Sequence, residues 1–227
     1  MKITALIVAG GKGKRMGAGM NKIFLKMLDR EVLFYTISVF EKNKKVDEII
    51  VVTAPDDIDR CIKLTEIYGF TKIKCVTEGG NERRESVMKG LLKADGDIVL
   101  IHDGARALVT DTEINACVED CIKYGASAVG VKCKDTLKSA DANGFVERTI
   151  DRDSTYLIQT PQAFYLNEIL DMHKRADRED FFATDDCMIA EHYGIKIKIS
   201  DGSYDNIKLT TPEDMIVGEQ ILRKRGI

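Results

Sequence analysis

Glycines and cations follow the first apolar run of this 227-residue chain. After the β-rich residues 3–8, residues 9–17 read Ala-Gly-Gly-Lys-Gly-Lys-Arg-Met-Gly. Glycine lets the backbone approach a ligand closely, and the N–H groups of such a turn can form a concavity that binds anions. Nearby cations could neutralise phosphate charge: Lys12, Lys14, Arg15 and Lys22. We therefore predict a polyphosphate-binding loop; the alternative is a glycine-rich turn with solvated lysines.

The spacing excludes two familiar phosphate-binding loops. A Walker A loop requires Gly-Lys-Ser/Thr, but the chain has no Ser or Thr between Thr4 and Thr36. A dinucleotide-binding G-x-G-x-x-G loop needs a third glycine where Met16 stands, and Gly17 comes one place late. The spacing therefore disfavours a dehydrogenase and leaves a different kind of phosphate-binding loop.

The charge balance indicates a small anionic substrate. The net charge is −3 at pH 7, so the chain lacks the overall basic field that nucleic-acid binding usually needs. No apolar run approaches the length of a membrane span, and no signal peptide precedes the first strand. The six cysteines include no C-x-x-C pair and are expected to be small, reduced residues. The sequence thus predicts a cytoplasmic protein with no membrane or nucleic-acid partner.

Apolar, β-rich runs alternate with helix-like patterns nearly to the end of the chain. Strands are expected at 3–8, 48–53, 73–77, 98–102, 127–131 and 196–200. Between them, apolar residues recur at helical spacing. The alternation predicts an α/β fold, a single Rossmann-like three-layer domain over residues 1–227 with a mostly parallel central sheet. Ligands bind beyond the carboxyl ends of such strands, and the glycine loop falls on that edge.

Residues 132–152 interrupt this alternation. Asn143-Gly144 is a strong signal for a two-residue hairpin turn, and the flanking residues alternate between polar and apolar. An isolated two-stranded hairpin is marginally stable in water. We therefore expect a protruding β-arm that packs on another chain, most simply in a two-fold homodimer.

Further chemical groups follow the predicted strands. The segment from Gly79 to Ser86 could bring backbone groups to a base or a phosphate, or form a plain turn and helix cap. In His102-Asp103-Gly104-Ala105-Arg106, the carboxylate could orient a hydroxyl or hold Mg²⁺ and the arginine could grip a phosphate. The alternative is an internal Asp–Arg pair, and His102 is expected to be structural. Residues 149–152, 159–162 and a strand-like segment at 204–210 complete the set.

Taken in order, these motifs resemble the cytidylyltransferase family that includes 2-C-methyl-D-erythritol 4-phosphate cytidylyltransferase. The resemblance covers nearly the whole chain and comprises A-G-G-K-G-K-R-M, Asn21-Lys22-x-Phe24-Leu25, Gly79-Gly80-x-Glu82-Arg83-x-x-Ser86-Val87, His102-Asp103-Gly104-Ala105-Arg106, Lys134-Asp135-Thr136, Asp151-Arg152, Gln159-Thr160-Pro161-Gln162-Ala163-Phe164, Thr184-Asp185-Asp186 and Asp205-Asn206-Ile207-Lys208. It implies that CTP and a polyol phosphate react to give a CDP-polyol and pyrophosphate, with Mg²⁺ as cofactor. The metal ligands are not implied.

The resemblance also implies roles for individual residues. The implied catalytic residues are Arg15, Lys22, Arg152 and Lys208, of which the first two would stabilise charge on the triphosphate. The implied nucleotide-binding residues are Ala9, Gly10, Gly11, Gly13, Lys14, Gly80, Asn81 and Ser86. The implied residues for the polyol phosphate are Asp103, Arg106, Thr136, Arg152, Thr160 and Lys208. Thr136 and Arg152 would reach over from the arm of the partner subunit.

The implied chemistry agrees with a chain poor in histidine. A phosphate nucleophile is largely dianionic near pH 7, because its second pKa is about 6, and it needs no general base. Transfer at phosphorus depends instead on in-line positioning and on cations at the phosphates. A site rich in Arg and Lys is what this mechanism requires.

Three residues depart from the family pattern, and the acceptor stays open. Asn21 and Ala107 stand where the family usually has proline, and Asn81 stands for an aspartate. The Gly10-Gly11 pair also resembles the ribitol 5-phosphate cytidylyltransferase branch, which makes CDP-ribitol for teichoic acids. The arm and the segment around Lys208 favour the isoprenoid branch. A non-catalytic nucleotide-binding regulator is the alternative of another class.

Overall fold

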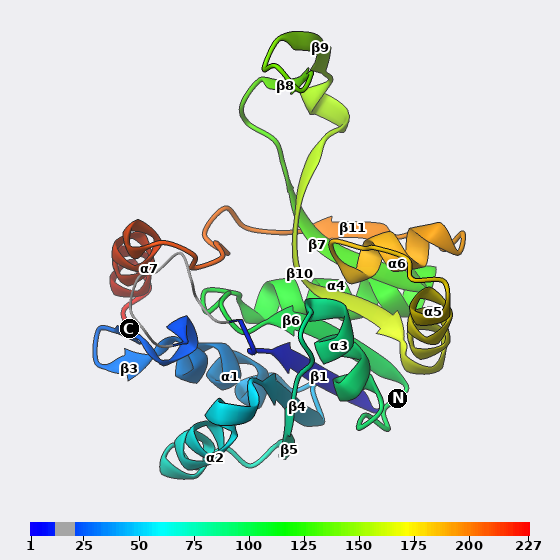
Figure 1. Cartoon of the computed structure of the whole chain (residues 1–227). Coiled ribbons are helices and arrows are strands. Elements are labelled where there is room, and N and C mark those ends of the chain that lie inside the picture. The colour runs from blue at the N-terminus through cyan, green and yellow to red at the C-terminus, as the bar shows by residue number, and fades with distance from the viewer. Residues whose placement is uncertain (12–20) are drawn as a thin grey trace.

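The computed structural model describes residues 1–11 and 21–227, which fold around a seven-stranded sheet (Figure 1). The strands lie in the order β11-β7-β10-β6-β1-β4-β5. Their bounds are β1 (Ile3–Val8), β4 (Glu48–Thr53), β5 (Ile73–Glu78), β6 (Ile98–Asp103), β7 (Ala126–Lys132), β10 (Tyr156–Tyr165) and β11 (Lys198–Asp201). The six strands expected from the sequence are all present, within two residues at each end.

The central strands of this mostly parallel sheet consist largely of apolar residues. Strands β4 and β6 are buried throughout, as expected of strands covered on both faces. Strand β10 is the exception among the described strands of this sheet, running antiparallel to both β6 and β7. Sequence analysis did not predict β10, because Pro161 lies inside it and proline argues against a central strand.

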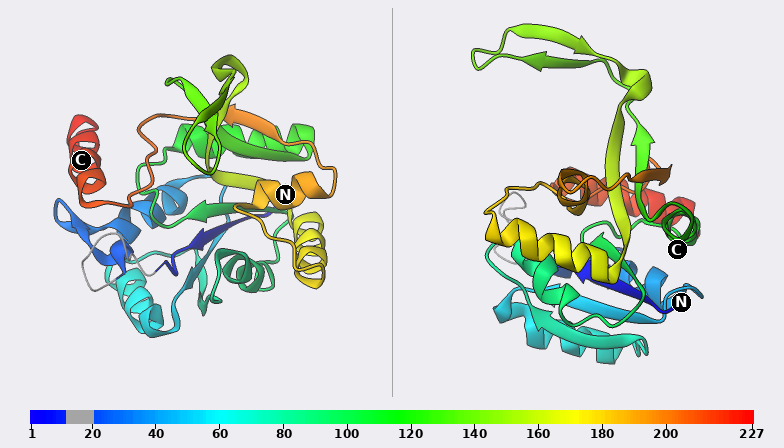
Figure 2. Two further views of the ribbon diagram at one scale, coloured as in Figure 1. Left: turned by 45° about the horizontal axis from the view of Figure 1, so that its top comes forward. Right: turned by 90° about the vertical axis from the view of Figure 1, so that its right-hand side faces the viewer.

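Helices cover both faces of the sheet and produce two apolar cores, which confirms the three-layer fold (Figure 2). One core holds buried residues of α1 (Val32–Lys42), α2 (Ile58–Ile67) and α4 (Asp111–Tyr124). The other holds residues of α3 (Arg83–Leu91), α5 (Leu166–Arg178) and α6 (Asp186–His192). None of the helices in the described part of the chain is long and apolar enough to cross a membrane.

The C-terminal helix α7 (Pro212–Lys224) packs beside a third, small core. Its partners include Met27 of the short hairpin β2 (Lys26–Met27) and β3 (Arg30–Glu31). Thr211 caps the helix and Asp214 completes the capping box. The preceding segment, expected to be strand-like, forms a turn and irregular backbone instead. There the N–H of Leu209 donates to the carbonyl of Ala105 (2.9 Å) rather than to a sheet partner.

The predicted β-arm is present and projects away from the sheet (Figure 1). It consists of β8 (Leu137–Ala140) and β9 (Val146–Ile150), which form a separate two-stranded sheet. The predicted two-residue turn is wrong, because five residues, 141–145, join the strands. The Asp141 carboxylate accepts from the N–H groups of Asn143 (3.0 Å) and Phe145 (2.9 Å), which favours this longer turn. Gly144 alone of the turn takes a positive φ, 86°.

Candidate active site

The carboxyl ends of four parallel strands bring the predicted phosphate and base loops to one edge of the sheet. The N–H of Gly79, which follows β5, donates to the carbonyl of Thr53 at the end of β4 (2.7 Å). The N–H of Gly104, which follows β6, donates to the carbonyl of Val8 at the end of β1 (2.8 Å). The loops after β1, β4, β5 and β6 are therefore neighbours, as the parallel topology predicts.

The start of the predicted nucleotide loop lies against the loop after β4. Ala9 is buried, and its N–H donates to the carbonyl of Val52 (2.7 Å). A Cβ atom at Gly10 would lie 3.4 Å from the backbone nitrogen of Ala54, whereas one at Gly11 would meet open space. The remaining predicted members of this loop, Gly13, Lys14 and Arg15, lie outside the described residues.

The second glycine turn packs tightly on Ser86 of α3. Ser86 is buried; its hydroxyl accepts from the N–H of Gly80 (3.0 Å) and donates to the carbonyl of Glu82 (3.0 Å). A Cβ atom at Gly79 would come within 2.6 Å of the Ser86 hydroxyl oxygen, so that position requires glycine. Asn81 is exposed at the tip of the turn. The structure therefore places Gly80, Asn81 and Ser86 together beside the first loop.

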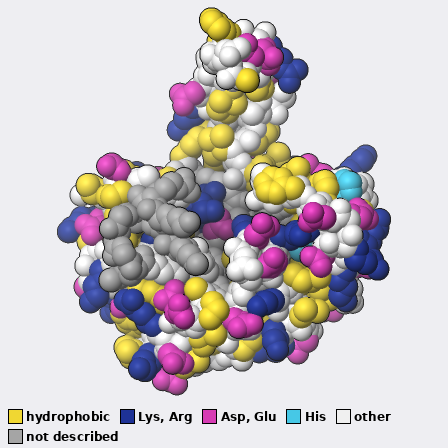
Figure 3. Space-filling model, in the orientation of Figure 1, with side chains coloured by type: hydrophobic (Ala, Val, Ile, Leu, Met, Phe, Trp, Pro, Cys, Tyr) yellow, Lys and Arg dark blue, Asp and Glu magenta, His cyan; other side chains and the backbone are white. Residues whose placement is uncertain are grey.

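Asp103, at the end of β6, is surrounded by three cations. The Nζ of Lys208 lies 2.7 Å from one carboxylate oxygen, and the Nε of Arg83 lies 3.3 Å from the other. The Nε of Arg106 is 4.0 Å away. Burial alone would raise the pKa of Asp103, but Arg83, Lys208 and Arg106 outweigh it and hold that pKa well below its usual range. Figure 3 shows acidic and basic side chains meeting below the base of the arm.

Four of the six residues predicted to hold the polyol phosphate meet here: Asp103, Arg106, Thr160 and Lys208. Thr160 of β10 accepts through its hydroxyl from the N–H of Asp103 (3.1 Å). Arg106 donates to the carbonyl of Asn206 (2.7 Å), and the Asn206 amide donates to the carbonyl of Thr160 (3.0 Å). These contacts connect β6, β10 and the segment that carries Lys208. Residues distant in the sequence thus form one charged cluster, within which Asp103 and Arg106 also form the internal pair considered above.

His102 has a structural role, as predicted. Its ring is fully buried, with one nitrogen 3.0 Å from the Thr160 hydroxyl and the other 3.1 Å from the carbonyl of Arg106. Burial lowers the pKa of His102 to about 4, so the ring is neutral near pH 7. It holds the walls of the cluster together and carries no charge for the reaction.

Arg83 is a member of the cluster that sequence analysis did not select. It pairs with Asp103 and, through its Nη1, with an oxygen of Asp186 at 2.8 Å. Asp186 is only 1% exposed and is 3.1 Å from the Nε2 of buried His173. The motif that contains Arg83 was recognised for its glycines and Ser86. The signal that could have identified it is an arginine in the first turn of a helix that begins at the ligand-binding edge.

Lys22 lies at the same edge of the sheet, whereas Thr136 and Arg152 do not. Lys22 begins a single 3-10 turn, Lys22–Phe24, directly after Asn21, whose side chain donates to the carbonyl of Ala9 (2.9 Å). Thr136 and Arg152 are exposed on the arm, which projects from the sheet beyond β7 and β10 (Figures 1 and 2). The other described predicted residues lie on the loops at this edge of the sheet or in the Asp103 cluster.

Sequence and structure comparisons identify the family. The model of the 2-C-methyl-D-erythritol 4-phosphate cytidylyltransferase family matches residues 3–224. Proteins of that name from Clostridium acetobutylicum and Clostridium botulinum strain 657 are 43% and 42% identical over 225 residues, with 98% of each chain covered.

Solved structures agree with the sequence match. A 4-diphosphocytidyl-2C-methyl-D-erythritol synthase from Anaerococcus prevotii superposes with a TM-score of 0.88 at 33% identity, covering 98% of this chain and 96% of its own. The Thermus thermophilus 2-C-methyl-D-erythritol 4-phosphate cytidylyltransferase gives 0.79 at 26% identity, covering 98% and 100%. The chain belongs to this family. It is therefore an enzyme of the nucleotidyltransferase class.

The described residues of this family member do not form a magnesium site of their own. No group of three or more His, Cys, Asp or Glu side chains within residues 1–11 and 21–227 could hold a metal ion. Asp103 is the buried carboxylate at the ligand-binding edge, but it already faces Lys208, Arg83 and Arg106. A divalent cation bound there would meet three positive charges.

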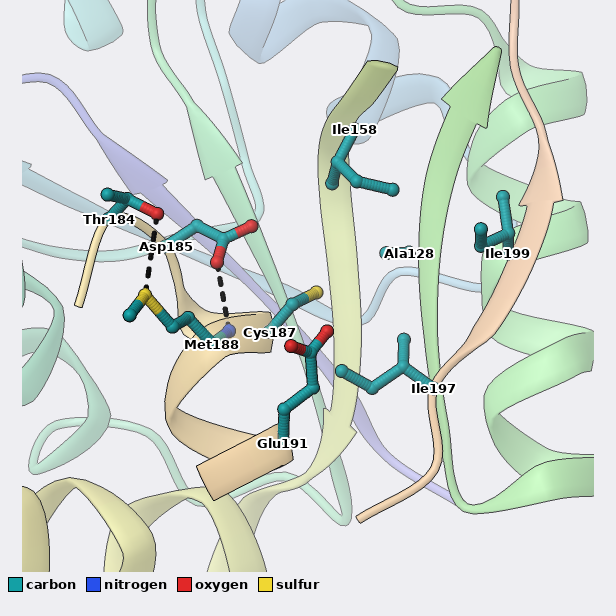
Figure 4. A pocket seen from close by; sticks show the side chains of 9 residues that line it. All are labelled: Ala128, Ile158, Thr184, Asp185, Cys187, Met188, Glu191, Ile197 and Ile199. Atoms are coloured by element: carbon teal, nitrogen blue, oxygen red, sulfur yellow. Dashed lines mark hydrogen bonds between the residues drawn. The ribbon is translucent and has the colours of Figure 1, made fainter. Parts of the chain in front are cut away.

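Two grooves in the described part of the chain are lined by residues other than those of the Asp103 cluster. One, of about 360 Å³, runs between α6 and the strands β7, β10 and β11 (Figure 4). Its lining side chains include the acidic Asp185 and Glu191 and no base, so it is unsuited to a triphosphate. The other, of about 440 Å³, lies between α1 and α7 and is lined mainly by apolar and aromatic residues.

The ionised state of Asp103 predicts an acid-dependent loss of stability. Its pKa is lowered in the folded chain, so its contribution is present above the ordinary Asp pKa of about 4 and is lost as the pH falls towards the folded value. We expect the free energy of unfolding to fall more steeply between about pH 5 and pH 2 in the wild type than in Asp103→Asn. Urea titrations of both proteins at each pH measure this difference. Equal slopes would mean that Asp103 is not paired in solution.

Proposed function

We propose that this chain transfers a cytidylyl group from CTP to the phosphate of 2-C-methyl-D-erythritol 4-phosphate. The products are CDP-methylerythritol and pyrophosphate, in the non-mevalonate route to isoprenoids. The observation that carries the proposal is the Asp103 cluster, which provides one carboxylate and three cations at the edge where the nucleotide loop begins, in a chain of this family.

The reaction needs charge and positioning rather than a base. An oxygen of the polyol phosphate attacks the α-phosphorus of CTP, and the bond from that phosphorus to the bridging oxygen of the β-phosphate breaks. The nucleophile is already ionised near pH 7, because its second pKa is about 6. Lys22 and Arg15 are proposed to stabilise the negative charge that grows on the phosphates.

The charge cluster suits the polyol phosphate. The Asp103 carboxylate can accept hydrogen bonds from hydroxyl groups of the polyol, and Arg106 and Lys208 can bind its phosphate. The side chain of Lys208 is 41% exposed, so it can turn from Asp103 to an incoming phosphate. Gly80, Asn81 and Ser86, beside the first loop, are proposed to contact the base.

The arm supports a homodimer in which each site is shared. Phe145 and Val146 at its tip are 72% and 62% exposed, and a two-stranded hairpin of this kind needs a packing partner for stability. A two-fold dimer would cover these side chains and bring Thr136 and Arg152 to the partner's cluster. We therefore propose that Arg152 of one chain and Lys208 of the other act on the same substrate phosphate.

Mixing two inactive variants tests the shared site. Arg152→Ala and Lys208→Ala should each be nearly inactive, whereas an equal mixture that exchanges subunits should recover about a quarter of wild-type activity, because half the dimers then contain one intact site. Pyrophosphate release after denaturation and joint refolding measures the recovery. A mixture no more active than its components, although dimeric, would place both residues in one chain's site.

Magnesium and location complete the proposal. We propose that Mg²⁺ enters with CTP, coordinated by the triphosphate oxygens, as is common for nucleotide substrates. A cytoplasmic location is supported by the six cysteines, all of which are free thiols, since oxidising compartments favour disulfides.

A pyrophosphate-release assay tests the activity. With CTP and Mg²⁺, turnover should be fast with 2-C-methyl-D-erythritol 4-phosphate and at least about 10²-fold slower with ribitol 5-phosphate, because the two polyols present different groups to Asp103. The reverse preference would assign the chain to the ribitol branch. CTP binding without turnover on either polyol would indicate a regulator.

A further inference from the structure

The side chain of Asn21 joins the two ends of the segment that contains the predicted nucleotide loop. Its Nδ2 donates to the carbonyl of Ala9 (2.9 Å), directly before Gly10 and Gly11. The same nitrogen donates to a carboxylate oxygen of Asp57 (2.9 Å). Asn21 directly precedes Lys22 in the chain, so its contacts fix where the backbone of Lys22 begins.

The other end of the Asn21 amide fixes the turn that carries Lys22. The Oδ1 of Asn21 accepts from the N–H of Ile23 (3.3 Å) and thereby caps the 3-10 turn, whose next N–H, that of Phe24, donates to the Asn21 carbonyl (3.1 Å). Asn21 is only 7% exposed. Water competes weakly for buried hydrogen-bonding groups, so these hydrogen bonds keep their geometry.

Asp57 is itself held by the loop after β4. It ends the 3-10 turn Pro55–Asp57, and its N–H donates to the carbonyl of Ala54 (2.9 Å). Ala54 is also the residue against which Gly10 packs, with only 3.4 Å between its nitrogen and a Cβ built at Gly10. One loop therefore supports both the start of the nucleotide loop and the residue before Lys22.

We propose that Asn21 and Asp57 form a hydrogen-bonded latch that positions Lys22 for catalysis. Asn21 stands where the resemblance expects proline; proline restricts the backbone by its ring, whereas the amide restricts it by three hydrogen bonds. Asn21 and Asp57 are positioning residues, because they act through Lys22. The inference rests on the proposed cytidylyl transfer, in which Lys22 stabilises charge on the triphosphate.

Asn21→Asp and Asp57→Ala are the informative substitutions. Asn21→Asp keeps the size and the cap on Ile23, but it cannot donate to Ala9 and it repels Asp57. A misplacement of about 1 Å can cost about 10²-fold in rate, so we expect kcat to fall by about that factor with KM for CTP changed less than about threefold. Asp57→Asn should retain most of the rate, because its amide oxygen can still accept from Asn21.

The chain contains a matched control in Asn43. It is also buried, its Nδ2 also donates to an aspartate (Asp111) and to a second acceptor (Asn115), and its Oδ1 accepts from the N–H of Lys45 two residues later. It lies between α1 and the start of β4, at the opposite edge of the sheet. Asn43→Ala should destabilise the fold and leave kcat unchanged.

Two further measurements decide the proposal. In a Lys22→Ala background, Asn21→Asp should lower kcat by less than about threefold, because the effects of residues that act through one another are non-additive. The latch is overturned if the losses of kcat in Asn21→Asp and Lys22→Ala are fully additive. It is also overturned if Asn21→Asp and Asn43→Ala lose kcat equally. Hydrogen exchange needs no turnover: the amide of Ile23 should exchange about tenfold faster in Asp57→Ala and unchanged in Asp57→Asn. Unaltered exchange in Asp57→Ala also overturns it, whereas an inactive wild type with altered exchange refutes only the proposed reaction.

Discussion

Lys22→Ala should lower turnover by about 10³-fold to 10⁵-fold, the range found for cations that stabilise phosphoryl-type transition states. The physical reason is that negative charge builds on the transferring phosphoryl group and the departing pyrophosphate. A fixed ammonium group beside them lowers the energy of the transition state. Lys22 is half-buried on a short turn beside the glycine loop. Arg15→Ala should lose turnover by a similar factor. Steady-state pyrophosphate release measures both.

The folded state should tolerate this loss of charge. Lys26, four residues later and exposed on β2, provides a nearby control, and Lys26→Ala should keep wild-type turnover. Thermal unfolding of the variants at matched concentration separates inactivity from unfolding. Turnover within tenfold of wild type in a folded Lys22→Ala or Arg15→Ala protein would refute the role of that residue.

Arg83→Ala should destabilise the fold by about 3 kcal/mol, the lower end of the range for breaking a buried ion pair. Two buried carboxylates each lose one partner: Asp103, 8% exposed, keeps Lys208 and Arg106, whereas Asp186, 1% exposed, keeps only His173. Arg83 is the group that connects the substrate-facing cluster to α6. Urea unfolding monitored by circular dichroism measures the change.

Conservative and surface variants make this prediction specific. Arg83→Lys keeps the charge but cannot contact both carboxylates with separate nitrogens, so an intermediate loss is expected. Lys89, on the same helix, pairs with half-exposed Glu78 at 2.7 Å, and Lys89→Ala should cost less than about 1 kcal/mol. If Arg83→Ala costs no more than Lys89→Ala, the buried bridge contributes nothing to stability.

The core strands could be predicted because each is a continuous apolar run with distinct ends. Strand β10 could not be predicted, because it contains a proline, which argues against a strand. The residues after that proline pair with both β6 and β7, and this pairing compensates for the proline. The five-residue arm turn was also missed. Asn143-Gly144 favours a shorter turn, but the Asp141 side chain satisfies two backbone N–H groups of the longer one.

The location of the site in the fold could be predicted from the sequence, but most of its side-chain contacts could not. A parallel sheet brings its strand ends to one edge, so the meeting of Gly10, Gly80 and Asp103 follows from the fold. Which cations reach Asp103 depends on the packing of α3 and of the chain after β11, and periodicity says nothing of either. Arg83 was therefore missed, and the roles proposed for Thr136 and Arg152 require a second chain.

The arm is an insertion within a long antiparallel pair. Strands β7 and β10 pair from Lys132 with Tyr156 to Ala126 with Phe164, with an irregularity between Ile158 and Gln162, so their pairing lies below the arm. Changes in the length or composition of the insert need not disturb the pairing beneath it. The arm and the charged cluster can therefore diverge separately in evolution, although β10 leads from the arm to Thr160 beside Asp103.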